Sequence, residues 1–360
     1  MNRLPLIGIT TGDPAGIGPE IIAMTLVDKT IYECCRPVVL GDPGVFLSAL
    51  SRCSLGGVRG LSVNVIPTPD QAGGRPGVVD LMAVSQLEDG AFLPGRPSAA
   101  GGRAMVAYII RAVEMALRGD IAGMVTCPIS KALMQEAGYA FEGHTQLIAH
   151  LTDTSDVVMM LAGDRLRVTL VTIHCAVRDV PQLLTRDGVL KTIRITERAL
   201  RRDFGLRSPR LAVAALNPHG GEAGLFGDEE TTIIAPAVEE AQKEGLQVEG
   251  PFPADTLFHK AVSGAYDAVV AMYHDQGLIP LKLLHFSDAV NVTLGLPIIR
   301  TSVDHGTAYD IAGTGKADPS SLKAAIRTAV LMAENRERNR APDDLCDLNK
   351  PDKLRNPVSQ

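Results

Sequence analysis

The chain has 360 residues, 46% of them hydrophobic and 21% charged, which predicts a globular protein with two domains. Its formal net charge of −6 argues against a nucleic-acid partner, because such surfaces usually need a basic patch, but a single pocket could still be positive and hold an anion. The six cysteines include no Cys-x-x-Cys pair, so we expect reduced thiols in a cytoplasmic protein. With no signal peptide and no apolar run long enough to span a bilayer, no membrane association is expected.

The first predicted element is a buried strand at residues 6–10, followed by a glycine-rich loop at 11–20. Pro19 suits the first turn of a helix, because proline lacks the N–H that would be unpaired there. The loop, which contains Gly12 and Asp13, would bring backbone N–H groups close to an anion, although a plain strand-to-helix turn has the same pattern. Its glycine order is not that of the Rossmann fingerprint.

The next segments continue the alternation of strands and helices. Strands are expected at 38–40, 61–66 and 121–126, a long connection at 70–101, and helices at 104–117 and, capped by Ser130, at 131–137. His144 and Thr145 fall in a loop before a further helix. Their imidazole and hydroxyl could hold a phosphate or hydroxyl group, but Thr145 could equally be a helix N-cap.

The C-terminal half repeats this alternation. Strands are expected at 157–161, 166–173, 211–216 and 268–273, and helices at 183–202, 229–244 and 320–335, the last capped by Ser320 or Ser321. Alternation of this kind predicts an α/β fold with a mainly parallel sheet, whose ligands bind beyond the carboxyl ends of the strands.

Three histidines follow apolar strands in the same way: His174, His219 and His274. Because the ends of parallel strands meet at one edge of a sheet, the three imidazoles could converge and bind Zn²⁺ or a similar divalent ion with an open position for substrate. Their spacing matches no local zinc motif, and three separate loop histidines remain the alternative.

Lys282, Asn291 and Arg300 are spaced nine residues apart on predicted strand or loop segments. Two cations and an amide could clamp a carboxylate or phosphate, although such cations are usually surface charges. Asp255 follows a proline turn and could be an acid/base group or simply a turn residue. These residues together indicate a metal-assisted enzyme acting on a small anion, by hydride transfer or by hydrolysis.

Several motifs resemble the 4-hydroxythreonine-4-phosphate dehydrogenase family, which includes paralogues acting on 4-phospho-D-threonate and 4-phospho-D-erythronate. They span most of the chain and read TGDPAGIGPE at 11–20, EGHT at 142–145, LNPHGGE at 216–222, YHDQG at 273–277, NVTLGLP at 291–297 and RTSVDHGTA at 300–308.

The resemblance implies an isocitrate/isopropylmalate dehydrogenase-like two-domain fold with a cleft between the domains. It places an NAD-side domain at 1–125 plus 301–340, a metal, substrate and dimerisation domain at 126–300, and a polar tail at 341–360. It also implies a homodimer whose active sites lie at the interface.

The resemblance further implies NAD and a divalent metal (Zn, Mg or Co) as cofactors, and oxidation with decarboxylation of a phosphorylated hydroxy acid. A cis-dihydrodiol carboxylate is a further substrate class of the paralogues, and a histidine-metal hydrolase is the alternative from another class. The implied site residues are His174, His219 and His274 for the metal; His144, Thr145, Lys282, Asn291 and Arg300 for the substrate; Gly12, Asp13, His305, Gly306, Thr307 and Ala308 for NAD; and Lys282 or Asp255 as acid/base.

Overall fold

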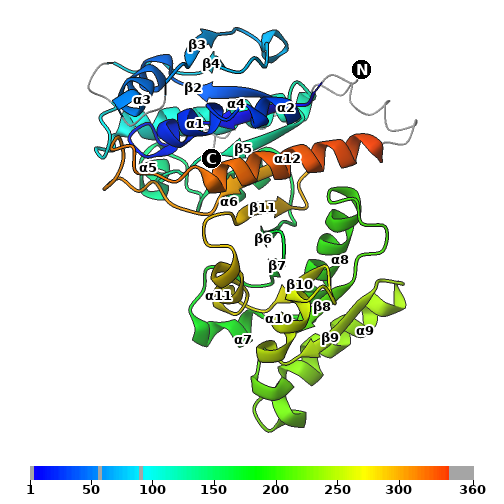
Figure 1. Cartoon of the computed structure of the whole chain (residues 1–360). Coiled ribbons are helices and arrows are strands. Elements are labelled where there is room, and N and C mark those ends of the chain that lie inside the picture. Colours follow the sequence, from blue (N-terminus) through cyan, green and yellow to red (C-terminus); the bar gives the residue numbers. More distant parts are fainter. Residues whose placement is uncertain (1–3, 56–58, 89–91, 340–360) are drawn as a thin grey trace. The chain divides into compact units, whose positions relative to one another are not determined.

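The computed structural model describes residues 4–55, 59–88 and 92–339, and the chain forms two compact units (Figure 1). The first comprises residues 1–156 and 296–360, and the second residues 157–295. These boundaries differ from the predicted ones at 126 and 300. Residues 126–156 and 296–300 belong to the first unit because strand β5 (Gly123–Thr126) pairs with β12 (Arg300–Val303) and helix α6 (His144–Leu151) packs on α4 (Ala99–Arg118). The predicted polar tail at 341–360 lies outside the described residues.

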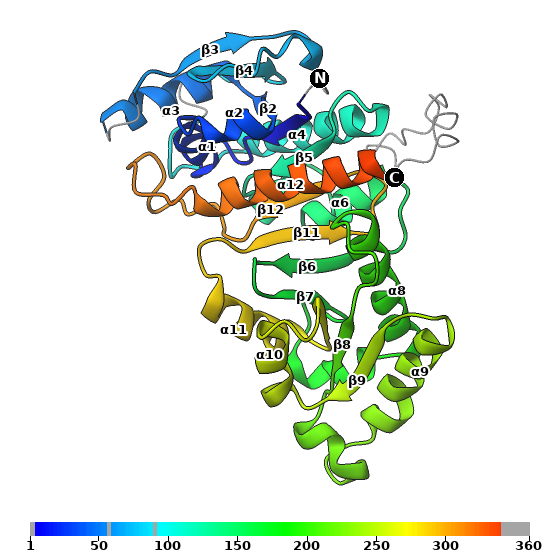
Figure 2. The same ribbon diagram turned by 45° about the vertical axis from the view of Figure 1, so that its right-hand side comes forward.

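The first unit is built on parallel strands in the order β3-β4-β2-β1-β5-β12. Helix α4 packs against the central strands β1, β2 and β5, and α12 (Ser320–Arg338) runs along β5 and β12 (Figure 2). The other elements of this unit are β1 (Leu6–Thr10), α1 (Gly18–Leu26), α2 (Thr30–Cys34), β2 (Arg36–Gly41), α3 (Pro43–Leu55), β3 (Ser62–Val65), η1 (Pro69–Gln71), β4 (Val78–Ala83) and α5 (Lys131–Glu136).

The second unit has strands in the order β11-β6-β7-β10-β8-β9. Strand β6 is antiparallel to both of its neighbours, and the remaining pairs are parallel, so the mainly parallel α/β fold is confirmed. The elements are β6 (Val158–Ala162), β7 (Arg167–Leu170), η2 (Val177–Asp179), α7 (Val180–Leu183), α8 (Arg186–Arg202), β8 (Leu211–Ala214), η3 (Pro218–Gly224), η4 (Glu230–Ile234), α9 (Ala235–Lys243), β9 (Val248–Phe252), α10 (Ala254–Val262), β10 (Ala268–Ala271), α11 (His274–Leu284) and β11 (Val290–Leu294).

Side-chain alternation along β7 explains why helices cover both faces of this second sheet. Val168 and Leu170 point into a buried apolar cluster that includes Leu257 of α10 and Leu281 of α11. Thr169, between them, points to the other face, where its Oγ1 accepts a hydrogen bond from Thr196 of α8 at 3.1 Å. No helix in the described part of the chain is long and apolar enough to cross a membrane.

Two sequence-based expectations for these elements are wrong. The long connection at 70–101 contains strand β4, which is buried between β2 and β3, and the first turn of α4, which is capped by Ser98. Helix α12 is not capped by Ser320 or Ser321, because Asp318 accepts hydrogen bonds from the N–H and hydroxyl of Ser320. The predicted Ser130 cap is confirmed, since its hydroxyl accepts the N–H of Leu133 at 3.3 Å.

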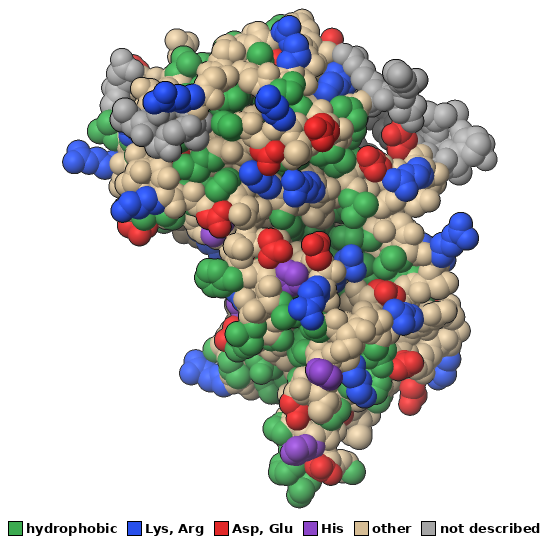
Figure 3. Space-filling model, in the orientation of Figure 1, with side chains coloured by type: hydrophobic (Ala, Val, Ile, Leu, Met, Phe, Trp, Pro, Cys, Tyr) green, Lys and Arg blue, Asp and Glu red, His purple; other side chains and the backbone are tan. Residues whose placement is uncertain are grey.

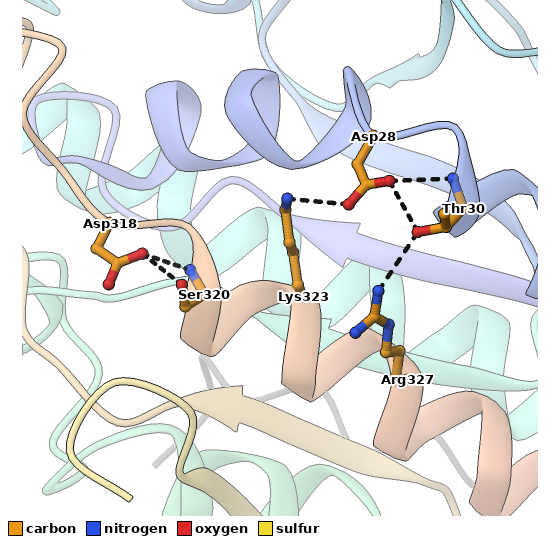
Figure 4. A network of polar contacts seen from close by, with 6 residues as sticks. All are labelled: Asp28, Thr30, Asp318, Ser320, Lys323 and Arg327. Atoms are coloured by element: carbon orange, nitrogen blue, oxygen red, sulfur yellow. Dashed lines mark hydrogen bonds and ion pairs between the residues drawn. The ribbon is translucent and has the colours of Figure 1, made fainter.

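A polar network joins α12 to the turn between α1 and α2 (Figure 4). The Asp28 carboxylate accepts hydrogen bonds from Lys323 Nζ at 3.0 Å and from the N–H and hydroxyl of Thr30 at 3.1 and 2.7 Å, while Arg327 donates to the Thr30 hydroxyl at 3.3 Å. The Lys323 bond, followed by the Thr30 bonds, lowers the pKa of Asp28 to about 2. The charged form of Asp28 is therefore favoured in the folded protein.

We expect Asp28→Asn to lower the free energy of unfolding at pH 7 by about 1 kcal/mol, because the partly exposed ion pair with Lys323 is lost. A pKa lower in the folded than in the unfolded chain stabilises above the unfolded value and stops doing so as pH falls from about 4 to about 2. Urea unfolding of both proteins at a series of pH values measures this, and a difference that persists undiminished at pH 2 contradicts it. Once Asp28→Asn is in place, adding Lys323→Met should change the stability little further.

Candidate active site

Two of the predicted histidines, His174 and His274, line one cavity in the second unit. Their ring centroids are 6.3 Å apart, and the cavity of about 200 Å³ is also lined by residues of η2, α7 and the first turn of α11. Parallel pairing of β7 with β10 continues beyond both strands, since Val171 and Thr172 donate backbone hydrogen bonds to Ala271 and Met272. The segments that lead to the two histidines are thereby fixed side by side.

The chemistry of this pair fits a divalent metal ion. A bond of about 2.1 Å from each imidazole nitrogen places two ring centroids about 5 to 6 Å apart on one ion, which is close to the observed separation. His274 also has the carboxylate partner that metal-binding histidines commonly have, because its Nδ1 lies 2.7 Å from Asp275 Oδ1. With the proton on Nδ1 in that bond, Nε2 carries the lone pair that a metal needs.

His219 does not line this cavity. It lies exposed in η3, with its ring 6.4 Å from that of Phe226. Within the described residues of one chain, no three His, Cys, Asp or Glu side chains are grouped so that they could hold a metal ion. Two of the three imidazoles thus lie together, and the third lies in the separate segment η3.

The other predicted residues of the second unit lie on three different elements. Asn291 is half-buried in β11, and Lys282 is half-buried in the last turn of α11, a helix that the sequence pattern did not predict. Asp255 is exposed in the first turn of α10, where its Oδ1 accepts the N–H of Thr256 at 3.0 Å.

In the first unit, the two loops predicted to bind NAD are in contact with each other. Gly12 has φ +69°, and a Cβ there would lie 2.3 Å from the carbonyl oxygen of Pro128, so only glycine fits. Thr307 accepts the backbone N–H of Ile17 at 3.0 Å, and a Cβ on Gly16 would lie 3.0 Å from the same oxygen. Residues of both loops, together with α3, line a hollow that includes Pro14, Gly16, Arg52, Phe92 and Gly313.

Two buried carboxylates that brace these loops were not recognised from the sequence in that role. Asp13 is fully buried, and its oxygens accept the N–H of Ala15 at 2.9 Å and the hydroxyl of Tyr309 at 2.6 Å. Burial raises the pKa of Asp13, although both hydrogen bonds oppose the change. Glu20 of α1 accepts the N–H of Gly313 at 2.6 Å. The buried Asp13 side chain therefore holds the two loops together, and no sequence signal links it to Tyr309, which is 296 residues away.

His144 and Arg300, both in the first unit, are close enough to interact electrostatically. Arg300 is 3% exposed and donates to Thr126 Oγ1 at 2.9 Å; its burial lowers the pKa of the guanidinium to about 9, which leaves it charged at pH 7. Burial, followed by repulsion from Arg300, lowers the pKa of His144 well below its usual value, so the imidazole is neutral. Its buried Nε2 has no hydrogen-bond partner among the described residues.

His144 and Thr145 open helix α6, whose N-cap is Gly143, so the N-cap alternative for Thr145 is wrong.

Comparison with known proteins identifies the family of this chain. Residues 33–329 match the family model described as pyridoxal phosphate biosynthetic protein PdxA. The chain is 54% identical to 4-hydroxythreonine-4-phosphate dehydrogenase of Desulforapulum autotrophicum over 94% of its length and 98% of that protein. It is 45% identical, over 94% of its length and 100% of the relative, to a Symbiobacterium thermophilum protein that carries the provisional name D-threonate 4-phosphate dehydrogenase.

A solved structure agrees with these matches. The crystal structure of 4-hydroxythreonine-4-phosphate dehydrogenase from Klebsiella pneumoniae is 42% identical, covers 92% of this chain and 99% of that one, and superposes with a TM-score of 0.85. The chain therefore belongs to the PdxA family of pyridoxal phosphate biosynthetic proteins, and it is an oxidoreductase of the dehydrogenase class.

Proposed function

We propose that the protein oxidises and decarboxylates 4-phosphohydroxy-L-threonine with NAD, and that a divalent metal is required. The products are 3-amino-2-oxopropyl phosphate, carbon dioxide and NADH. The proposal rests chiefly on similarity to 4-hydroxythreonine-4-phosphate dehydrogenases over almost the whole chain. The imidazole pair of His174 and His274 around one cavity supports the metal requirement, and the buried cation Arg300 supports an anionic substrate.

The substrate carries a phosphate and a carboxylate, and the chain supplies cations and polar groups for them. Arg300 and Lys282 contribute positive charge, Asn291 an amide, and Thr145 a hydroxyl. His144, being neutral, has both a donor and an acceptor nitrogen and can bind a substrate hydroxyl or phosphate oxygen without adding charge. The hydroxy acid is then oriented by groups that distinguish its two ends.

Oxidation of the hydroxyl-bearing carbon releases one proton and one hydride. A divalent cation (Zn, Mg or Co) held by His174 and His274 would lower the pKa of that hydroxyl, and bound NAD would supply the hydride acceptor. Lys282 or Asp255 takes the hydroxyl proton as general base, and a proton is returned to carbon when carbon dioxide leaves the β-keto acid. We propose that the loops containing Gly12, Asp13, and His305 through Ala308 bind NAD, with Asp13 bracing the loops rather than facing the cofactor.

A second substrate is supported by one comparison. The Symbiobacterium thermophilum relative matches almost the whole chain and is named for D-threonate 4-phosphate. That compound shares the phosphate, the carboxylate and the hydroxyl to be oxidised, and differs in bearing a hydroxyl in place of the amino group. The same cationic residues would bind it, so the residue types do not separate the two.

With added divalent metal, the purified protein should reduce NAD, and its kcat/KM should be highest for 4-phosphohydroxy-L-threonine. NADH absorbance measures this across a panel that also contains 4-phospho-D-threonate, 4-phospho-D-erythronate and a cis-dihydrodiol carboxylate. A chelator should abolish the rate and metal should restore it. A preference for 4-phospho-D-threonate overturns the substrate assignment, and metal-dependent hydrolysis without NADH formation overturns the reaction class.

We further propose that two copies of the chain associate and that His219 of each completes the metal site of the other. Large apolar side chains are exposed on η2, α7 and α11, each of which contributes a residue to the cavity lining, and just beyond α11: Val177, Leu183, Ile279, Leu283 and Phe286, the last two more than 80% exposed. Ile279 and Leu283 are four residues apart on α11 and so lie on one face of that helix, and Phe286 follows two residues beyond the helix end; the three residues are called the apolar stripe. Figure 3 shows such hydrophobic side chains and histidines at the surface of this unit. Exposed apolar stripes of this kind are typical of subunit interfaces.

Mixed dimers test the shared site directly. His219→Ala and His274→Ala should each lose metal and NADH formation. Dimers refolded from an equal mixture should regain about a quarter of the native activity, because half are mixed and each mixed dimer has one native site. Metal content of the isolated mixed dimer should be one ion per dimer. No recovery on mixing, with folded dimers present, contradicts a site made from two copies.

Charge placed on the apolar stripe should separate the copies. We expect Leu283→Asp to give a monomer in sedimentation at micromolar concentration, and to bind metal weakly because His219 of the second copy is removed. Leu47→Asp is the matched control, since Leu47 is 54% exposed on α3 and should change neither property. A Leu283→Asp protein that stays dimeric with full metal content contradicts the proposed interface.

A further inference from the structure

The loop that carries His219 has an unusual backbone. Residues 219–223 have consecutive positive φ angles: 54° for His219, 69° and 80° for Gly220 and Gly221, 45° for Glu222 and 54° for Ala223. Left-handed conformation costs roughly 1 to 2 kcal/mol for each residue other than glycine, and here three such residues adopt it. A run of this kind persists only where surrounding groups hold it.

The groups that hold it are two successive glutamates acting on Asn217. Glu230 Oε1 accepts the backbone N–H of Asn217 at 2.7 Å, and its Oε2 accepts the Asn217 side-chain amide at 3.0 Å. Glu229 Oε2 accepts the same amide at 2.6 Å. Both hydrogens of the amide are thus engaged, and the residue two positions before His219 is fixed through its backbone and its side chain.

Two glycines leave room for the contacts between Asn217 and the two glutamates. A Cβ on Gly221 would lie 2.6 Å from Glu230 Oε2, and a Cβ on Gly227 would lie 2.5 Å from Asn217 Nδ2, so glycine is needed at both positions. Glu230 is the first residue of the π-helical turn η4, a rare form that inserts one extra residue into a helix and occurs often at functional sites. This turn brings the Glu230 carboxylate into contact with Asn217, which precedes the left-handed segment.

Glu230 is only 3% exposed, and burying a carboxylate is costly unless its hydrogen bonds compensate. Its oxygens accept hydrogen bonds from the backbone N–H and the side-chain amide of Asn217. A neutral side chain at this position would avoid the cost of burying a charge, but it would hold Asn217 less well. We propose that Glu230 is a positioning residue, which keeps the loop in its left-handed conformation and so directs His219 toward the metal site of the second copy. This inference rests on the proposed function of His219.

Glu230→Gln exchanges one carboxylate oxygen for an NH₂ group that faces an N–H donor of Asn217. We expect zinc binding to the full-length dimer, measured by competition with a chromogenic chelator, to weaken by about 10- to 100-fold. Amide hydrogen exchange at residues 217–226 should accelerate. Glu239→Gln makes the same charge change on an exposed position of α9 and should alter neither measurement. Gly227→Ala, which crowds the side chains of Asn217 and Glu229, should reproduce the loss if Glu230→Gln does not fold.

Mixed dimers separate a positioning role from general damage to the fold. Glu230→Gln combined with His274→Ala should recover activity and metal, because one site then has both native histidines from the first chain and a native loop from the second. Glu230→Gln combined with His219→Ala should recover neither, since both loops are defective. Zinc affinity in Glu230→Gln equal to that of the native protein overturns the inference. If the native dimer itself binds no metal, the proposed function fails instead.

Discussion

Parallel pairing of β7 with β10 is the constraint on which the geometry of the His174–His274 pair depends. The register aligns Val168 with Val269 and Leu170 with Ala271, and the backbone bonds continue through Thr172 and Met272. The Thr172 hydroxyl adds a bond of 2.8 Å to the Met272 carbonyl, and the Met272 N–H is in turn bound by Gln276. His174 and His274 therefore leave the sheet edge from neighbouring, rigid segments, and their separation is set by the sheet rather than by loop flexibility.

The same constraint shows what could be predicted from the sequence. Apolar runs ending in histidine predicted the strands and the sheet edge, and this was enough to bring two imidazoles together. His219 also follows an apolar strand, but its position depends on Glu230, eleven residues later, and on a left-handed turn that hydrophobic periodicity does not encode. Strand-end position thus predicts a site only where the chain continues straight from the strand, as it does after β7 and β10.

The first unit shows the converse case, in which the sequence pattern left two interpretations open. The loop at 11–20 could have been a plain turn or an anion-binding loop, and both interpretations predict glycines. The structure shows why Gly12 is required, namely the approach of the Pro128 carbonyl, and shows that Asp13 is occupied by Ala15 and Tyr309. Contacts between residues nearly 300 positions apart decide which polar groups remain for a ligand, and a single sequence contains no measure of them.

Electrostatics then favour an anionic ligand in the first unit. Burial makes the Arg300 charge expensive, yet its pKa of about 9 keeps it charged, so a phosphate or carboxylate would offset a cost already present in the folded protein. The neighbouring His144 is neutral because burial disfavours its charged form and repulsion from Arg300 adds to that effect, and both lower its pKa. A fixed guanidinium beside a neutral imidazole attracts one anionic group and leaves a hydrogen-bonding nitrogen for an adjacent hydroxyl. The pair therefore suits a ligand that has both an anionic group and a hydroxyl, as a phosphorylated hydroxy acid does. A ligand with two anionic groups and no hydroxyl suits it less well, because the neutral His144 adds no positive charge for the second anionic group.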